Sequence, residues 1–419
     1  MTAEIAVLNF HGVAMAADSA VSIGSNKVYN SANKLFALSK KHPVGIMIYG
    51  NAQMMSVPWE TLIKSYRSTL KNKKYKKLKD YGDSFIEYLT KTRDIGLENE
   101  ELYLNITISR VVKNLREAVE QAVGEGFRAT PTLTNIEIQR IISATILANS
   151  SQLIGRDKLI KIDAQWINEL VGTINSTVDS FIAASFENIA LSTKEKKLIL
   201  DACISEVCLS EFSPSHSGIV ISGFGNDEIY PSLISYEIEW RINKFLKFRI
   251  SNQQHINVSS GASIVPFAQR EMVDTFIEGT DRRLVDYINS RISEVFNDLP
   301  NTMLEGTSVR ASSKNLALLK SNGLAIAKKL AQEIREVQNI NFVNPVLDSV
   351  AALPLDELAS MAHTLINMTS FKRRVSLNTE SVGGPIDVAV ISKGDGFIWI
   401  NRKHYFKPEL NQHYFVNNS

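Results

Sequence analysis

The sequence predicts a mixed α/β (α+β) fold in which two antiparallel sheets are covered by layers of helices. Short apolar runs bounded by turn residues occur near both ends of the chain and near its middle. Between them lie long stretches in which apolar residues recur every three or four positions, as on one face of a helix. Strand pairs that alternate with blocks of paired helices favour this layered arrangement over a βαβ array.

The first 50 residues predict two hairpins. Residues 4–10 and 13–17 are joined by the turn signal His11-Gly12, and residues 34–38 and 44–49 are separated by the polar segment 39–43. The period changes after residue 52, because apolar side chains from Met55 to Leu70 recur at helical spacing. A second helix follows near residue 85.

Residues 96–212 are helical in pattern, with capping boxes that start at Thr134 and Ser192. Strand signals return at residues 218–222, 230–238 and 245–250, and Gly223-Phe-Gly225 is expected to be a turn. After Ser260-Gly261 we expect a helix, and the helical pattern continues to about residue 337. A last helix is expected near Pro354, followed by a strand pair at residues 386–391 and 397–400.

Composition and charge exclude several classes of protein. The 419 residues include 46 Lys and Arg against 44 Asp and Glu, a net charge of +2, which argues against a nucleic-acid partner. A lysine run from Lys71 to Lys79 predicts a solvated helix face, with contact to an anionic partner as the alternative. Neither a signal peptide nor an 18-residue apolar run occurs, so we expect a cytoplasmic protein with no membrane partner.

The sequence predicts neither a cofactor nor a metal. It contains no GxxxxGK[ST] phosphate loop, no HExxH zinc helix and no GxSxG nucleophile elbow. Its two cysteines, Cys203 and Cys208, lie five apart in an apolar helical stretch, which predicts buried free thiols.

The N-terminus carries the strongest chemical signal. Thr2 follows Met1, and removal of the initiator methionine would leave Thr2 with a free α-amine. An N-terminal threonine combines a nucleophilic hydroxyl with its own base. The unperturbed pKa of an α-amine, about 7.7–8.0, lies close to neutrality, where a general base is most effective.

From Thr2 onward the chain resembles the proteasome β-type subunit family, within the N-terminal nucleophile hydrolase superfamily. Asp18, at the end of the motif HGVxxAxDS, lies sixteen residues after Thr2, and Lys34 lies sixteen residues after Asp18. Gly50 follows an apolar strand after a two-residue insertion, and Gly50-Asn51 stands where the family has Gly-Gly.

The resemblance implies a four-layer αββα sandwich with inserted helical subdomains, and a role for each matched residue. Thr2 would be nucleophile and base, and Lys34 would lower the pKa of the Thr2 unit. Asp18 would orient Lys34. The N–H of Gly50, placed at the start of the first helix, would stabilise the oxyanion.

Farther along the chain the resemblance is weaker. Ser260 is assigned to a serine that hydrogen-bonds near the threonine amine, with Ser259 as the shifted option. The family's late Asp-x-x-Ser-Gly-Gly segment corresponds to residues 379–384, where Thr379 and Val382 replace Asp and Ser. Either Glu380 and Ser381 substitute from shifted positions, or the amine lacks part of its hydrogen-bond shell.

The resemblance also divides the chain and implies its partners. Residues 1–95, 213–280 and 345–400 are expected to form one discontinuous domain, with helical insertions at 96–212 and 281–344 and a tail at 401–419. The implied activity is that of a threonine peptidase acting on a peptide or protein. A homo-oligomeric ring and an unfoldase ATPase partner are also implied. The alternatives are an inactive scaffold or interaction subunit, and an amidase acting on a small molecule.

Overall fold

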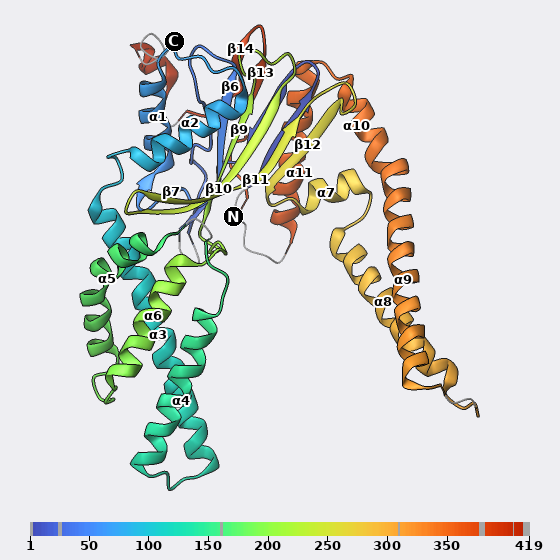
Figure 1. Ribbon diagram of the computed structural model, residues 1–419. Helices are drawn as coiled ribbons and strands as arrows, with labels where there is room; N and C mark the ends of the chain where they lie inside the picture. The colour runs from blue at the N-terminus through green and yellow to red at the C-terminus, as the bar shows by residue number, and fades with distance from the viewer. Residues whose placement is uncertain are drawn as a thin grey trace.

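The computed structural model describes residues 3–23, 27–159, 162–308, 311–376, 382–404 and 406–413 (Figure 1). Within these residues the chain combines helices with antiparallel sheets, as the sequence predicts. Thr2, Thr379, Glu380 and Ser381 lie outside the described residues.

The first sheet gathers strands from both ends of the chain and from its middle. Its order is β12-β1-β2-β13-β14, and all neighbouring strands in it are antiparallel. Side chains of β1 and β2 are buried on both faces, which explains their nearly continuous apolar sequence. The strands are β1 (Ala3–Asn9), β2 (Val13–Ala17), β12 (Ala262–Ala268), β13 (Asp387–Ser392) and β14 (Gly396–Asn401).

The second sheet has the order β11-β10-β9-β6-β5 and is also antiparallel. Two short strand pairs, β3 (Val21–Ile23) with β4 (Lys27–Tyr29) and β7 (Gln53–Met54) with β8 (Val57–Pro58), lie outside both sheets. The strands of the second sheet are β5 (Leu35–Ala37), β6 (Val44–Gly50), β9 (Ser217–Gly223), β10 (Ser232–Ile242) and β11 (Phe245–His255).

The two sheets share one buried apolar cluster. Ala6 and Leu8 of β1 belong to this cluster together with Met47 of β6 and Val220 of β9. The alternate β1 residues face the other way and pack against α11, in agreement with the two-residue period of a strand.

Helices cover the outer faces of both sheets. On the second sheet, α1 and α2 bury aromatic and aliphatic side chains against β6, β9 and β10. On the first sheet, α11 packs along β1, β2 and β13, beside α7 and α10. These helices are α1 (Trp59–Leu70), α2 (Leu78–Lys91), α7 (Glu271–Glu278), α10 (Asn344–Ala351) and α11 (Leu355–Val375).

The remaining long helices form two separate projections (Figure 1). One contains α3 (Leu97–Ala129), α4 (Asn135–Ile154), α5 (Ala164–Ser185) and α6 (Thr193–Cys208), and the predicted capping boxes begin α4 and α6. The other is the hairpin of α8 (Arg282–Leu304) and α9 (Ser313–Gln338), which continues through the π-helical turn Asn339–Val343 into α10.

Two details of the predicted secondary structure are wrong. No helix follows Ser260-Gly261, because residues 262–268 form β12 and pair along the whole of β1. Gly50 does not begin a helix either, because it ends β6 and α1 starts nine residues later at Trp59.

Candidate active site

A buried ion pair joins Asp18 to Lys34. Asp18 follows β2 and Lys34 precedes β5, and the Lys34 Nζ lies 2.6 Å from the Asp18 Oδ1. The Lys34 side chain is only 3% exposed and the Asp18 side chain 0%. A buried pair of this kind persists only when further hydrogen bonds satisfy its polar atoms.

Backbone donors supply those bonds to Asp18. Its Oδ1 also accepts the N–H of Ala3 at 3.1 Å, and its Oδ2 accepts the N–H groups of Ala20 at 3.2 Å and Gly383 at 3.1 Å. Asp18 therefore connects Lys34, the start of β1 and the glycine pair of the late segment. Ala3 is the residue that follows Thr2, so this carboxylate contacts the chain one residue from the predicted nucleophile.

Gly50 lies at the end of β6, close to Lys34. The N–H of Ile48, two residues earlier, donates to the Lys34 carbonyl at 2.9 Å. Gly50 has φ +77°, and a Cβ at this position would lie 2.5 Å from the His216 carbonyl oxygen. Both the backbone conformation and the close approach require glycine here.

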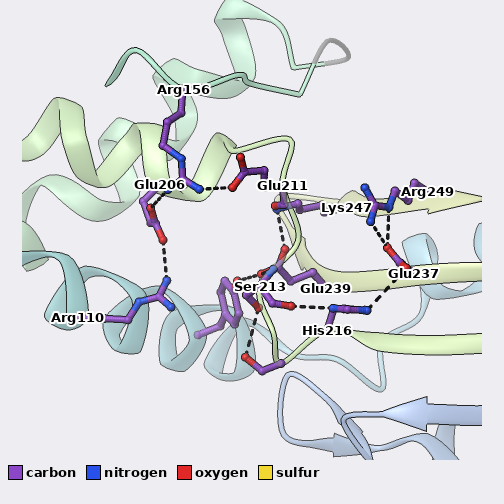
Figure 2. A network of polar contacts seen from close by, with 12 residues as sticks. Arg110, Arg156, Glu206, Glu211, Ser213, His216, Glu237, Glu239, Lys247 and Arg249 are labelled. Carbon is purple, nitrogen blue, oxygen red and sulfur yellow. Dashed lines mark hydrogen bonds and ion pairs between the residues drawn. The ribbon is translucent and has the colours of Figure 1, made fainter. Parts of the chain in front are cut away.

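A network of polar contacts holds the loop that contains Ser213 and His216, next to Gly50 (Figure 2). The His216 carbonyl accepts the N–H of Asn51 at 3.2 Å, while the His216 Nδ1 lies 2.7 Å from the Ser213 carbonyl. The His216 Nε2 lies 3.9 Å from Glu237, which also pairs with Arg249. These contacts fix the His216 backbone against the end of β6.

The same network continues to the helices. The buried Lys247 pairs with Glu239 at 2.6 Å, and Arg110 of α3 pairs with Glu206 of α6 at 2.8 Å (Figure 2). Arg156 lies between Glu206 and Glu211. Through the hydrogen bond from the Lys247 Nζ to the Glu211 carbonyl, these contacts link the α3–α6 projection to β10 and β11 of the second sheet.

Glu4 is a site residue that the sequence reasoning missed. Its side chain is 1% exposed, and among the described residues neither carboxylate oxygen has a hydrogen-bond partner. Burial raises the pKa of Glu4 well above its usual value; the Asp18 carboxylate adds to the rise and the Lys34 cation opposes it. The sequence signal that could have identified Glu4 is its position as the single charged residue within an otherwise largely apolar strand.

The structure does not bring Ser260 to this site. Asn9 pairs with Ala262 and Ala3 pairs with Ala268, so Ser260 lies at the opposite end of β1 from Ala3. Its N–H donates to Asn257 in a local turn that also contains the shifted option, Ser259. The assignment of Ser260 to the site is therefore wrong.

The late glycine pair, in contrast, does reach the site. Besides the Gly383 N–H bond to Asp18, the Gly383 carbonyl accepts the N–H of Ser19 at 3.1 Å. Val382, which replaces the family's serine, is fully buried in the apolar cluster beside α11. The Ser19 hydroxyl donates to the Pro385 carbonyl.

Neither a metal-binding cluster nor a reactive thiol is found in the described part of the chain. No cluster of three His, Cys, Asp or Glu side chains that could hold a metal occurs there. Cys203 and Cys208 are free and buried, as predicted, and burial raises their pKa values to about 12 and about 11. Thiols with such pKa values are poor nucleophiles. Among the described helices, none is long and apolar enough to cross a membrane.

No family model matches the chain, and no curated protein matches it. Solved structures match nearly all of it at low similarity. Anbu (ancestral beta-subunit) from Yersinia bercovieri is 10% identical, with 99% of this chain and 94% of that chain covered and a TM-score of 0.30. The structure described as the helical assembly of the Anbu complex from Pseudomonas aeruginosa is 9% identical, with 99% and 93% covered and a TM-score of 0.29.

Anbu from Hyphomicrobium sp. strain MC1 is similarly distant, at 9% identity, coverage of 99% and 94%, and a TM-score of 0.28. Scores of this size do not establish a shared fold, so these similarities carry no argument here. The assignment of the chain to the proteasome β-type subunit family is wrong, because no family model matches the chain. The spacing that suggested the family lies within the first 50 of 419 residues.

Proposed function

We propose that the chain is an N-terminal threonine hydrolase that cleaves amide bonds with Thr2 after Met1 is removed. One observation carries the proposal: the buried Lys34–Asp18 pair is hydrogen-bonded to the N–H of Ala3, the residue next to Thr2. A desolvated cation beside an α-amine lowers its pKa and keeps it neutral, as a general base must be. The layered arrangement of sheets and helices is compatible with the αββα sandwich of this class.

In the proposed reaction the Thr2 amine takes the hydroxyl proton, directly or through one water. The hydroxyl oxygen then bonds to the carbonyl carbon of the substrate, and the carbonyl electron pair moves to oxygen. The N–H of Gly50 would donate to this oxyanion, a contact typically worth about 2.7–4 kcal/mol. Collapse of this tetrahedral intermediate breaks the C–N bond of the substrate, and the departing amine takes the proton from the Thr2 amine.

Water completes the cycle by attacking the acyl-ester, with the same amine as base. The products are a carboxylic acid and the regenerated hydroxyl. Asp18 has no direct role in these steps; it positions Lys34 and the start of β1. Ser260 has no role in this scheme, because it lies at the far end of β1.

We propose a peptide or protein as the substrate, with a small-molecule amide as the alternative. The test combines intact mass, which reports removal of Met1, with covalent labelling by a threonine-directed β-lactone. Labelled Thr2 in the wild type and no label in Thr2→Ala are expected. Retained Met1, or equal labelling of both proteins, would contradict the proposal, because a blocked amine cannot act as base.

A second candidate function is that of an assembly scaffold, and the α8–α9 hairpin favours it. In α8 the apolar residues Leu284, Ile288, Val295 and Leu299 are 39–51% exposed at helical spacing. Among the described residues of α8 and α9, only Pro300, Gly323 and Ala327 are buried. We propose that this face packs against another copy of the chain; the scaffold and the hydrolase are compatible.

A further inference from the structure

We propose a second ligand site, in which the groove between α1, the β5–β6 turn and the β13–β14 turn binds a small molecule carrying a chain of phosphate groups. The groove is called the basic groove below and is defined by the cations that line it: Lys40, Lys41, Lys64, Arg67, Lys71, Lys393 and Arg402. Asp18, Lys34 and Gly50 do not line it. The proposal is independent of the hydrolase activity.

The basic groove has the size of a small-molecule site. Its volume is about 910 Å³, within the usual range of roughly 300–1,000 Å³ for ligand pockets. Its walls come from three separate segments, residues 33–43, 60–72 and 393–402. Cations from all three segments therefore face one cavity instead of forming a stripe along one helix.

The charge of the basic groove differs from that of the chain. Its lining contains seven Lys and Arg residues but only two carboxylates, Glu60 and Asp395, which leaves an excess of five positive charges. The whole chain has a net charge of only +2, so the rest of the molecule is net negative. A concentrated positive field in a cleft attracts and retains anions.

The two lining carboxylates have partners of their own. Glu60 pairs with Lys64 at 2.6 Å, and Asp395 accepts a hydrogen bond from the Ser392 hydroxyl. In the described part of the chain, the ammonium groups of Lys40, Lys41 and Lys71 form neither an ion pair nor a hydrogen bond. Bringing several cations to one cavity is unfavourable unless an anion binds among them.

Lys393 shows how one of these cations is placed. Its Nζ donates to the carbonyls of Gly225 and Asn226, at 2.6 and 2.8 Å. These bonds hold the β13–β14 turn against the β9–β10 turn without neutralising the ammonium charge. Another wall is α1, whose buried face packs on the second sheet and whose other side contributes Lys64 and Arg67, with Lys71 directly after the last helical residue.

The spacing on α1 favours a chain of anionic groups over a single one. With a rise of about 1.5 Å per residue, Lys64 and Arg67 lie roughly 4–5 Å apart along the helix axis, and Lys71 follows the last residue of the helix. Adjacent phosphates of one molecule could thus each contact a different cation. Guanidinium groups such as those of Arg67 and Arg402 match phosphate oxygens in bidentate geometry.

The test is isothermal titration calorimetry of the full chain at 0.15 M salt, with sodium triphosphate and, separately, magnesium-free ATP. Both ligands are expected to bind with a Kd below 100 μM. Lys64→Glu/Lys71→Glu should weaken binding at least tenfold. The matched control is Lys328→Glu/Lys329→Glu on the exposed surface of α9, which changes the charge equally and should leave the Kd within twofold.

Three results would overturn the proposal: no binding at 1 mM triphosphate, equal weakening in both double variants, or tighter binding of single-stranded polynucleotide than of triphosphate. Equal weakening would mean that binding depends only on the net charge of the protein. Tight polynucleotide binding would indicate a nucleic-acid surface. If Lys64→Glu/Lys71→Glu does not fold, Lys40→Ala/Lys41→Ala in the exposed turn replaces it, with the same tenfold expectation.

Discussion

At the residue scale, Lys34 has both a chemical and a structural role in the proposed site. Lys34→Ala is expected to abolish amide hydrolysis, since the Thr2 amine would lose the cation that lowers its pKa. The substitution also leaves Asp18 buried without its counter-charge, which typically costs about 3–5 kcal/mol. The control is Thr2→Ala, which should be equally inactive but as stable as the wild type. Substantial turnover by folded Lys34→Ala would contradict the assignment.

Glu4 leads to a prediction about stability and pH. Its folded-state pKa is raised, so the fold favours the neutral carboxyl. The unfolded chain ionises near pH 4.3, and from there up to the folded pKa stability falls by about 1.4 kcal/mol per pH unit. The contribution of Glu4 is therefore fully present below pH 4 and is lost as pH rises through the folded pKa.

Glu4→Gln removes this titration while keeping the shape of the side chain. Thermal unfolding should give equal Tm values for variant and wild type near pH 4, and a Tm for the variant that is increasingly higher above pH 5. Glu101→Gln, an exposed position on α3, is the matched control and should show no such trend. A Glu4→Gln variant that is less stable than the wild type at pH 8 would show that Glu4 is ionised in the folded protein.

Substitution of Gly50 tests whether the close backbone approach at the end of β6 requires glycine. Gly50→Ala would place a methyl group 2.5 Å from the His216 carbonyl oxygen at φ +77°. We expect backbone strain to lower the free energy of unfolding by about 1–3 kcal/mol, together with loss of amide hydrolysis. Gly394→Ala is the control, since its Cβ would meet nothing within 4 Å. Chemical denaturation and an amide-hydrolysis assay measure the two effects, and an active, fully stable Gly50→Ala would contradict the requirement for glycine at this position.

At the element scale, one buried arginine attaches α3 to the second sheet. Arg241 of β10 donates to the carbonyls of Thr92 and Ile95 and pairs with Glu100 at 2.6 Å, with both side chains buried. Arg241→Met should cost about 3–5 kcal/mol and expose the start of α3 to hydrogen exchange. Arg249→Met on β11 removes an exposed pair and should cost under about 1 kcal/mol. Equal effects would mean that Arg241 does not anchor α3.

The elements also show what the sequence could and could not predict. Hairpins and capping boxes depend on neighbouring residues, so β1–β2, β5–β6 and the starts of α4 and α6 were predictable. The strand β12 was not, because its pairing with β1 joins residues about 260 positions apart. The ion pair of Asp18 with Lys34 was expected from the resemblance to a known family, whereas the burial of Glu4 depends on a sheet-to-sheet interface that no local pattern encodes.

At the scale of the whole molecule, the α8–α9 hairpin leaves a stripe of apolar side chains partly exposed. A helix pair in water is stabilised mainly by apolar packing, and this one leaves Leu284, Ile288, Val295 and Leu299 at least 39% exposed. If these residues form a self-association surface, sedimentation velocity should show an oligomer. Ile288→Glu/Val295→Glu should be monomeric, because both charges would enter the contact.

The matched control for this experiment is Glu294→Lys/Asp298→Lys, which alters charge on exposed α8 positions beside the apolar stripe. Its oligomeric state should match that of the wild type if association is apolar, and it should change if association depends on ion pairs. Hydrolysis measured on the same samples separates the two proposed functions. An active monomer would show that the site is complete within one chain, whereas activity lost together with association would mean that a second copy completes it.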